Sequence, residues 1–504
     1  MARKHQPTIC ARAVKLTLGG ALLSSVLAVP SIASASSLSQ AYKEATTNDK
    51  ITVSLVNYYK SAHRWDTDVK YFDENGKFRQ SEEGHHTQAE WTQSVGMFYN
   101  SGKISLGDSP IKMNLNLGYS HIFELDSQYP GGMHNWHGGQ KLLESKDCVW
   151  TGGEKFKGQY KCYDVEGFGK VPMANAKFYW KGGNLTVGDG FFNTGMITTA
   201  AADDATLSSY RGVMLRHKWN NYRFDAAFVT GFMDGLADKM GDLTTNSNYY
   251  DPYPNTYDYL YTGRVDYRAG RDWGYVFSYG EAQDYLRRFH TNVWMNHMIT
   301  PETKLHLKAQ YYYNKAAGDL WHEDVERGVA AFDDHAYLIA YHGKLERDAW
   351  GLWYGYHTVD APRSDGRGGF SYGFGGAKGY LSLVTSPGYS SFRSDGGQAH
   401  VVGISYDLRH FGIPDLKLSY RFHWERKAEQ HFDNNDQLAM GRGEEHVIDV
   451  FYRPRSGSMK GFEFLLRSSM YRPDRTYARL VSERSADRGD IDAIKAIVSY
   501  SFKL

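Results

Sequence analysis

The sequence lacks a long apolar segment after residue 35, because nowhere do about 18 consecutive apolar residues occur. This absence excludes a transmembrane helix there. The net charge is only +1, which gives no reason to expect a nucleic-acid partner. Ser, His and Asp are all present, but no nucleophile and base stand out as a pair, so neither an enzyme nor a cofactor is expected.

Cysteine is also scarce, with three residues in the chain. Cys10 lies ahead of the apolar run of an N-terminal leader, where it is badly placed for a lipoprotein anchor. Cys148 and Cys162 remain, and in an oxidising compartment such a pair predicts a disulfide that closes a short loop. A metal site is the weaker interpretation, because no pair of histidines lies nearby.

The first 35 residues have the order of a secretory signal peptide. A basic region is followed by an apolar run from Leu16 to Val29 and by small residues at Ala33-Ser34-Ala35. The basic residues are Arg3, Lys4, Arg12 and Lys15. A membrane anchor is the alternative, but the apolar run is too short for one. The sequence therefore predicts a cleaved signal peptide over 1–35 and one domain over 36–504.

Tyrosine and glycine are abundant, at 38 and 52 residues, although the mean hydropathy is −0.56. The last segment shows how a chain rich in apolar and aromatic residues can have a negative mean hydropathy, because its apolar and polar residues alternate with a period of two. Its apolar positions are Ala496, Val498, Tyr500, Phe502 and Leu504, and its polar positions are Lys495, Ser499, Ser501 and Lys503. Strands with one lipid-facing and one wet side predict an all-β protein, a transmembrane antiparallel β-barrel.

The same alternation predicts about eighteen strands, within the even-numbered series of bacterial barrels. Their approximate ranges are 51–60, 87–99, 111–123, 174–180, 185–190, 212–219, 222–232, 257–267, 273–280, 289–298, 305–314, 334–342, 349–357, 399–408, 416–425, 446–453, 462–470 and 491–504.

The links between these segments alternate between short and long. Short turns follow the even strands, as at Asn220-Asn221, and long links follow the odd strands. The long links are about 61–86, 124–173, 191–211, 233–256, 315–333, 358–398, 426–445 and 471–490. This rhythm is typical of barrels with periplasmic turns and long external loops, whereas a soluble β-sandwich has no reason to show it. Aromatic residues at strand ends, such as Trp219, Trp273 and Trp424, indicate an interfacial girdle.

Residues 36–50 are too short a leader to be the plug of a TonB-dependent transporter. An eighteen-strand barrel is wide enough for an aqueous channel, so a loop must narrow it for selectivity. The best candidate is 191–211, which is rich in small residues and carries Asp203 and Asp204. We expect it to fold into the lumen; an ordinary external loop is the alternative.

Basic residues predominate at the positions expected to face the lumen. The candidates are Lys112, Lys177, Arg216, Arg223, Arg264, Lys308, Lys417, Arg421 and Arg467, with His306 and His423 in the same pattern. A line of cations facing loop acids favours anionic groups, and arginine holds a carboxylate by two hydrogen bonds. The alternative is that these cations only pair with neighbouring acids such as Asp225, Asp266, Asp449 and Glu463.

The long links also contain aromatic residues that could stack on sugar rings or simply pack the loops. These are Trp136, Trp150, Tyr249, Tyr250, Tyr253, Tyr257 and Trp321.

Two late segments resemble the OprD family of substrate-specific outer-membrane porins. Ser405-Tyr406-Asp407-Leu408, Phe411-Gly412-Ile413-Pro414-Asp415-Leu416 and Tyr420-Arg421 are similar to that family's "YDL…yGvPGL…vRY" hairpin. Lys460-Gly461-Phe462-Glu463-Phe464 with Leu466-Arg467 resembles its "kdlsfRiR" strand, and 188–207 sits at the position of its constriction loop. The 124–173 link, with its two cysteines, departs from the family pattern.

The resemblance implies an eighteen-strand monomeric barrel with a narrow eyelet, a basic ladder that includes Arg421 and Arg467, and uptake of carboxylates, amino acids or short peptides. A chitooligosaccharide or other sugar channel is the alternative within the family. From other classes, an adhesion or structural barrel and an outer-membrane hydrolase remain alternatives. The expected partners are a small solute, outer-membrane lipid and lipopolysaccharide; a monomer is favoured over a trimer, and the expected location is the bacterial outer membrane.

Overall fold

The computed structural model describes most of the chain after the leader. The described residues are 40, 43–66, 69–72, 78–81, 84–128, 142–150, 160–199, 205–245, 254–364, 368–379, 383–390, 392–432, 437–474 and 490–504. The predicted signal peptide, residues 1–35, lies outside them.

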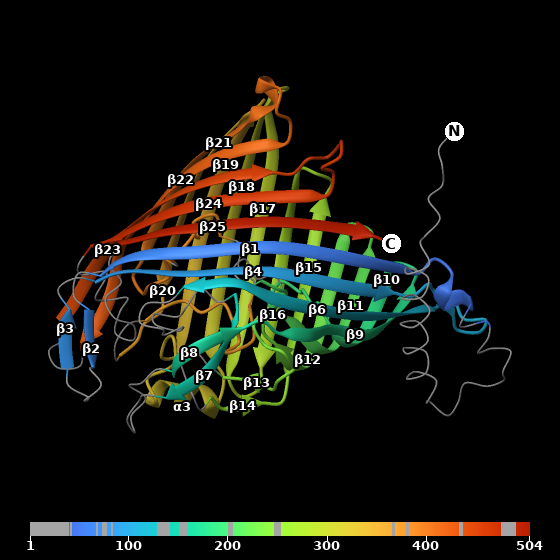
Figure 1. The fold of residues 1–504 in the computed structure, drawn as a ribbon, viewed down its shortest axis with the longest axis horizontal. Coiled ribbons are helices and arrows are strands. Elements are labelled where there is room, and N and C mark those ends of the chain that lie inside the picture. Colours follow the sequence, from blue (N-terminus) through green and yellow to red (C-terminus); the bar gives the residue numbers. More distant parts are fainter. Residues whose placement is uncertain are drawn as a thin grey trace.

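Eighteen antiparallel strands form a closed barrel, in which β25 pairs with β1 (Figure 1). In order around the wall they are β1 (Lys50–Asp66), β4 (Gly84–Asn100), β6 (Lys112–Gln128), β9 (Gly169–Trp180), β10 (Gly183–Gly190), β11 (Ser209–Trp219), β12 (Tyr222–Met233), β15 (Leu260–Ala269), β16 (Trp273–Ala282), β17 (Leu286–Thr300), β18 (Thr303–Ala316), β19 (His335–Arg347), β20 (Trp350–Asp360), β21 (Gln398–Asp407), β22 (Leu416–Phe432), β23 (Gln437–Tyr452), β24 (Phe462–Pro473) and β25 (Asp490–Lys503). The prediction of an antiparallel barrel of about eighteen strands is confirmed.

The long links contain small elements that the alternation did not predict. Three hairpins are β2 (Val69–Phe72) with β3 (Phe78–Ser81), β7 (Glu144–Trp150) with β8 (Tyr160–Glu166), and β13 (Leu243–Thr244) with β14 (Thr256–Tyr257). The helix α3 (Asp319–Glu326) also lies in a long link. Two more small elements lie in the short connections instead: the strand β5 (Ile104–Ser105), which pairs with the start of β6, and the 3-10 helix η3 (Leu408–Phe411) between β21 and β22. Within the described ranges, no helix has the length and apolar character needed to cross a membrane.

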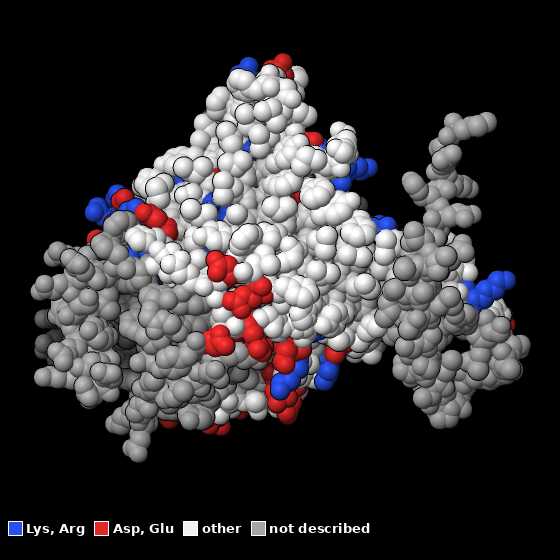
Figure 2. Space-filling model, in the orientation of Figure 1, with Lys and Arg blue, Asp and Glu red and all other residues white. Residues whose placement is uncertain are grey.

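Each strand separates its side chains into two sets because successive residues point to opposite faces of the sheet. On β12, Phe224 and Phe228 are exposed on the outside, whereas Asp225 between them is buried inside. On β22, Leu418 and Tyr420 are exposed outside, whereas Arg421 turns inward and pairs with Asp449. Most of the strand wall seen in Figure 2 is therefore uncharged, as a surface in contact with lipid requires.

Tight turns join the strands at the end of the barrel that also carries the C-terminus (Figure 1). Gly182, in the turn between β9 and β10, has φ 84, and Asn220, between β11 and β12, has φ 51. Glycine and asparagine accept this left-handed conformation at little cost, which lets the strand reverse within a few residues. The long links lie at the opposite end, so by the barrel rule the turns face the periplasm.

The largest buried core lies inside the barrel, between inward loops and the inner face of the wall. It contains Trp321 of α3, Phe192, Phe332 and Phe374 from the links, and Leu338 from β19. Trp321 is 1% exposed, and its indole nitrogen donates to the backbone oxygens of Phe332 and Asp333 at 3.2 and 2.8 Å. The long links are therefore built into the lumen rather than simply extended into the medium.

The β7–β8 hairpin places the backbones of Cys148 and Cys162 directly opposite each other. Cross-strand partners lie about 4.5–5.5 Å apart, within the separation that a disulfide spans. We expect alkylation and mass spectrometry of the unreduced protein to find these two thiols blocked. Reduction should leave the barrel folded, because its wall is closed by backbone hydrogen bonds. Unfolding of the whole barrel on reduction would contradict this.

Candidate functional site

The link after β10 folds into the lumen, as the sequence predicted. Phe192, Met196 and Ile197 are at most 1% exposed, although they lie in a connection between two strands. The hydroxyl groups of Thr194 and Thr262 on β15 lie 3.1 Å apart, which ties this link to the inner wall. The acids expected in it, Asp203 and Asp204, lie outside the described residues.

Gly195 allows this link to lie close against the wall. Its φ is 88, and a Cβ there would lie 3.1 Å from both Arg264 Cδ and Ser278 Oγ. A side chain would thus be strained by its backbone conformation and crowded by its neighbours. Glycine at this position therefore allows the link to pack closely on Arg264 of β15 and Ser278 of β16.

A second link, between β20 and β21, also folds inward, and the sequence did not predict it. The Asn314 amide donates to Ser371 O at 2.7 Å, the Tyr257 hydroxyl donates to Phe374 O at 2.7 Å, and the Arg288 guanidinium donates to Tyr372 O. Burial raises the pKa of the Tyr372 phenol, which therefore stays neutral at physiological pH. The glycine-rich composition of 366–397 was the one local signal, because glycine permits backbone to pack closely on backbone.

The two inward links are bonded to each other. Ile197 and Gly379 form an antiparallel bridge, and Thr198 N donates to Lys378 O at 3.2 Å. The hydroxyl of Tyr210 on β11 donates to the same Lys378 oxygen at 2.7 Å. The two links therefore form one hydrogen-bonded unit inside the barrel, which is also bonded to β11.

The far part of the second link is held against β20–β23. Glu445 on β23 accepts hydrogen bonds from the backbone N–H groups of Gly388, Tyr389 and Ser390 at 2.7–2.8 Å, and from the Ser390 hydroxyl at 2.6 Å. His357 on β20 bonds through one ring nitrogen to the Thr385 hydroxyl and through the other to Phe392 O, at 2.6 and 2.7 Å. Glu445 and His357 are buried, and these hydrogen bonds all go to the second link. These bonds hold the link against the wall, which indicates a fixed constriction.

Replacing Glu445 with alanine should release this part of the loop. Hydrogen bonds to a charged acceptor are the strong ones, so losing four weakens docking by roughly 3 kcal/mol, about a hundredfold in the docked population. We expect single-channel recordings of Glu445→Ala to show frequent current fluctuations and a larger mean conductance. Glu444→Ala is the matched control, because Glu444 points to the opposite face of β23. Quiet, unchanged currents in Glu445→Ala would show that the loop is held elsewhere.

Arginines flank an acid on the wall next to this constriction. Arg421 on β22 and Arg467 on β24 lie 2.8 and 2.6 Å from the carboxylate of Asp449 on β23. Their side chains are 15% and 22% exposed. Asp449 lies on the same face of β23 as Glu445 and about 13 Å further along the strand. The group therefore carries one net positive charge near the narrowed part of the lumen.

A second basic group lies across the barrel. Asp225 is fully buried between Arg216 and Arg223, at 2.9 and 2.7 Å, and Asp266 pairs with Arg264 and Arg268 at 3.0 and 3.2 Å. β15, which carries Arg264, is nine strands from β24, which carries Arg467, in a ring of eighteen. The two groups therefore face each other across the lumen. This arrangement depends on the order of the strands around the ring, so the sequence of one strand could not predict it.

The remaining cations are more dispersed. Lys308 on β18 is half-buried opposite His342, and Lys417 on β22 lies opposite Asp407. Lys177 is half-buried on the inner face of β9, whereas Lys112 is exposed at the start of β6. His306 pairs with Glu346 at 2.9 Å, and His423 bonds to Thr385 O at 3.2 Å.

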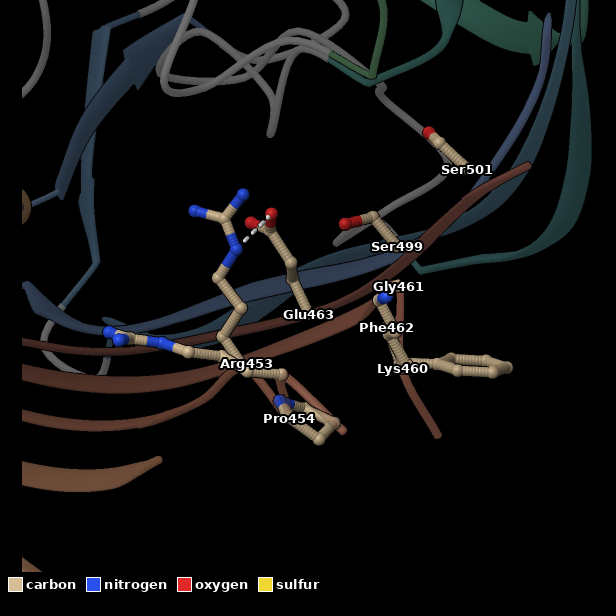
Figure 3. A pocket seen from close by; sticks show the side chains of 9 residues that line it. Arg453, Pro454, Lys460, Gly461, Phe462, Glu463, Ser499 and Ser501 are labelled. Carbon is tan, nitrogen blue, oxygen red and sulfur yellow. Dashed lines mark ion pairs between the residues drawn. The ribbon is translucent and has the colours of Figure 1, made fainter. Parts of the chain in front are cut away.

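The predicted pairing of inward cations with acids holds for Asp225, Asp266 and Asp449. Glu463 pairs instead with Arg453, at 2.9 Å, inside a hollow of about 420 Å³ at the periplasmic ends of β23–β25. Figure 3 shows the two side chains turned toward each other, with Ser499 and Ser501 beside them. Glu463 therefore neutralises a cation at the mouth rather than one of the predicted lumen residues.

The aromatic candidates for sugar stacking that can be assessed serve as packing residues. Trp321 is a buried residue of α3, and Tyr257 is 4% exposed and bonded through its hydroxyl to the second inward link. Trp136, Tyr249, Tyr250 and Tyr253 lie outside the described residues, as does the side chain of Trp150. The described part of the chain contains no cluster of His, Cys, Asp and Glu that could hold a metal ion.

A family model described as "outer membrane porin, OprD family" matches residues 138–504. The chain belongs to the OprD family of outer membrane porins. It is thus a channel protein rather than an enzyme at the level of the family, and its place is the bacterial outer membrane. No curated protein matches the chain.

Solved OprD-type structures share its fold. Pseudomonas aeruginosa OccK9 (OpdG) aligns with a TM-score of 0.69 at 16% identity, covering 91% of this chain and 100% of that one. Acinetobacter baumannii OccAB1 aligns with a TM-score of 0.70 at 14% identity, covering 92% and 99%. P. aeruginosa OpdK, solved with vanillate, aligns with a TM-score of 0.65 at 14% identity, covering 91% and 100%. At these identities the likeness establishes the fold alone.

Proposed function

We propose that this OprD-family porin admits small anionic solutes in preference to neutral or cationic ones, with carboxylates, amino acids or short peptides as its substrates. The observation that carries the proposal is the group formed by Arg421, Asp449 and Arg467 next to the loop held by Glu445. Solutes must approach the wall there, and the wall bears net positive charge.

The wider lumen supports the same preference. Six arginines surround three aspartates in the two facing groups: Arg216, Arg223, Arg264, Arg268, Arg421 and Arg467 around Asp225, Asp266 and Asp449. A solute carboxylate can take a guanidinium N–H that its aspartate leaves free, since each guanidinium has five. The structure of OpdK with vanillate, a small aromatic carboxylate, adds a parallel from a protein of the same fold.

The decisive test compares solutes of one size and different charge. Gluconate, sorbitol and N-methylglucamine differ in charge, and none crosses a bilayer unaided. Liposomes containing the folded protein should swell fastest in gluconate and slowest in N-methylglucamine. Equal rates would remove the claim of anion preference, and fastest entry of sorbitol would favour a sugar channel instead.

A further inference from the structure

Two lysine ammonium groups lie over one tyrosine ring where the lumen meets the periplasm, and an arginine lies near one of them. The Lys103 ammonium lies 4.7 Å from the centre of the Tyr179 ring, and the Lys177 ammonium lies 5.2 Å from it. Arg216 on β11 also lies close enough to repel Lys177. Lys177 is three residues before the end of β9, and Lys103 lies in the connection between β4 and β6. We call Lys103, Lys177 and Arg216 the exit cluster.

The exit cluster differs from the other basic groups because its lysines have no acid. Among the described residues, no carboxylate forms an ion pair with Lys103 or Lys177. Asp225 is already enclosed by Arg216 and Arg223. Glu44, which lies close enough to Lys112 to interact with its charge, accepts hydrogen bonds from Ser105 N and Gln40, which lower the pKa of its carboxyl.

A half-buried ammonium without a counter-charge is electrostatically unfavourable, and two further cations nearby increase the cost. The Tyr179 ring offsets only part of it, because cation–π contacts at partly exposed sites are weak. Adjacent groups on β9 and β10 supply no negative charge: Lys177 lies opposite Thr186, and Tyr179 lies opposite Asn184. A bound anion would relieve the repulsion by accepting hydrogen bonds from both ammonium groups.

We propose that the exit cluster is an anion-binding station at the periplasmic mouth, suited to a solute that carries two carboxylate groups. Two separate ammoniums and a guanidinium match two negative charges better than one. The station receives the anion after it has passed the arginines near the constriction. This proposal rests on the proposed function in one respect: a solute from outside must pass through the lumen to reach the station.

Succinate is the probe, and its binding to the folded full-length protein in detergent can be measured by titration calorimetry without any conduction. Replacing both lysines (Lys103→Gln with Lys177→Gln) should weaken succinate binding by about tenfold or more, because two charge-assisted hydrogen bonds are lost. The matched control, Lys304→Gln with Lys460→Gln, removes the same charge from the periplasmic ends of other strands and should change binding less than about threefold. Heat-modifiable mobility in gels verifies that each variant is folded.

Equal weakening in both double variants, or no succinate binding by the parent protein, would overturn the station. If only the exit-cluster variant binds weakly while neither protein conducts, the station stands and the proposed channel function fails. The opposite result is also distinguishable. If the protein conducts and prefers anions but the lysine changes leave succinate binding unaffected, the proposed channel function stands and the anion-binding station is ruled out.

Discussion

The double variant Arg421→Ala with Arg467→Ala is expected to lose its preference for anions. Both changes remove the cations that flank Asp449, so the group changes from one net positive to one net negative charge. Close to a constriction, potentials of several kT set the local ion concentrations, and the chloride-to-potassium permeability ratio should fall roughly fivefold or more. The ratio is measured from the zero-current potential in a KCl gradient.

Two further variants separate charge from shape. Adding Asp449→Asn to the double variant restores neutrality and should recover part of the ratio. Arg347→Ala with Arg409→Ala removes two exposed arginines from the periplasmic end of the barrel, where their side chains are 70% and 56% exposed, and should leave the permeability ratio almost unchanged. If the first double variant folds into a heat-resistant barrel and its ion selectivity is unchanged, the claim that a ladder of basic residues sets the anion preference is wrong.

Excision of the second inward link should have the largest effect on current. Residues 366–391 include the segments bonded to Arg288, Asn314 and Glu445, and a short Gly-Ser linker can replace them. An eighteen-strand barrel without the second inward link in its lumen is wide enough for an open aqueous channel, so single-channel conductance should rise several-fold. Anion preference should fall at the same time, because solutes no longer pass close to the wall.

The control excision removes 146–164, most of the β7–β8 hairpin, while Leu142 and Leu143 keep their bonds to Glu90. Conductance should then stay near that of the parent protein. If the excision of 366–391 yields a folded barrel of unchanged conductance, the second link does not narrow the path.

The strands could be predicted because their signal is local. Alternation with a period of two in Ala496, Val498, Tyr500 and Phe502 requires only neighbouring residues, and the same parity placed Arg421 and Arg467 on the inner face. Ion pairing was also partly foreseeable: Arg223 and Asp225 are two residues apart on one face of β12. The boundaries were less accurate, since β1 continues to Asp66, well past the predicted end at residue 60.

The second inward link could not be predicted in the same way. What holds it are Glu445, Arg288 and Asn314, which lie 55 to 84 residues away in sequence. Nothing in the residues of the link itself specifies these partners, because they meet only after the barrel has closed. The facing positions of Arg264 and Arg467 have the same origin, since they depend on the number of strands in the ring.

The central claim is that the described barrel is a selective channel, and single-channel conductance in a planar bilayer tests it most directly. With succinate or gluconate added to one side, we predict small, steady openings whose current is interrupted as the carboxylate concentration rises. Absence of conductance from correctly folded protein would contradict the claim, and would indicate a lumen closed by its inward links.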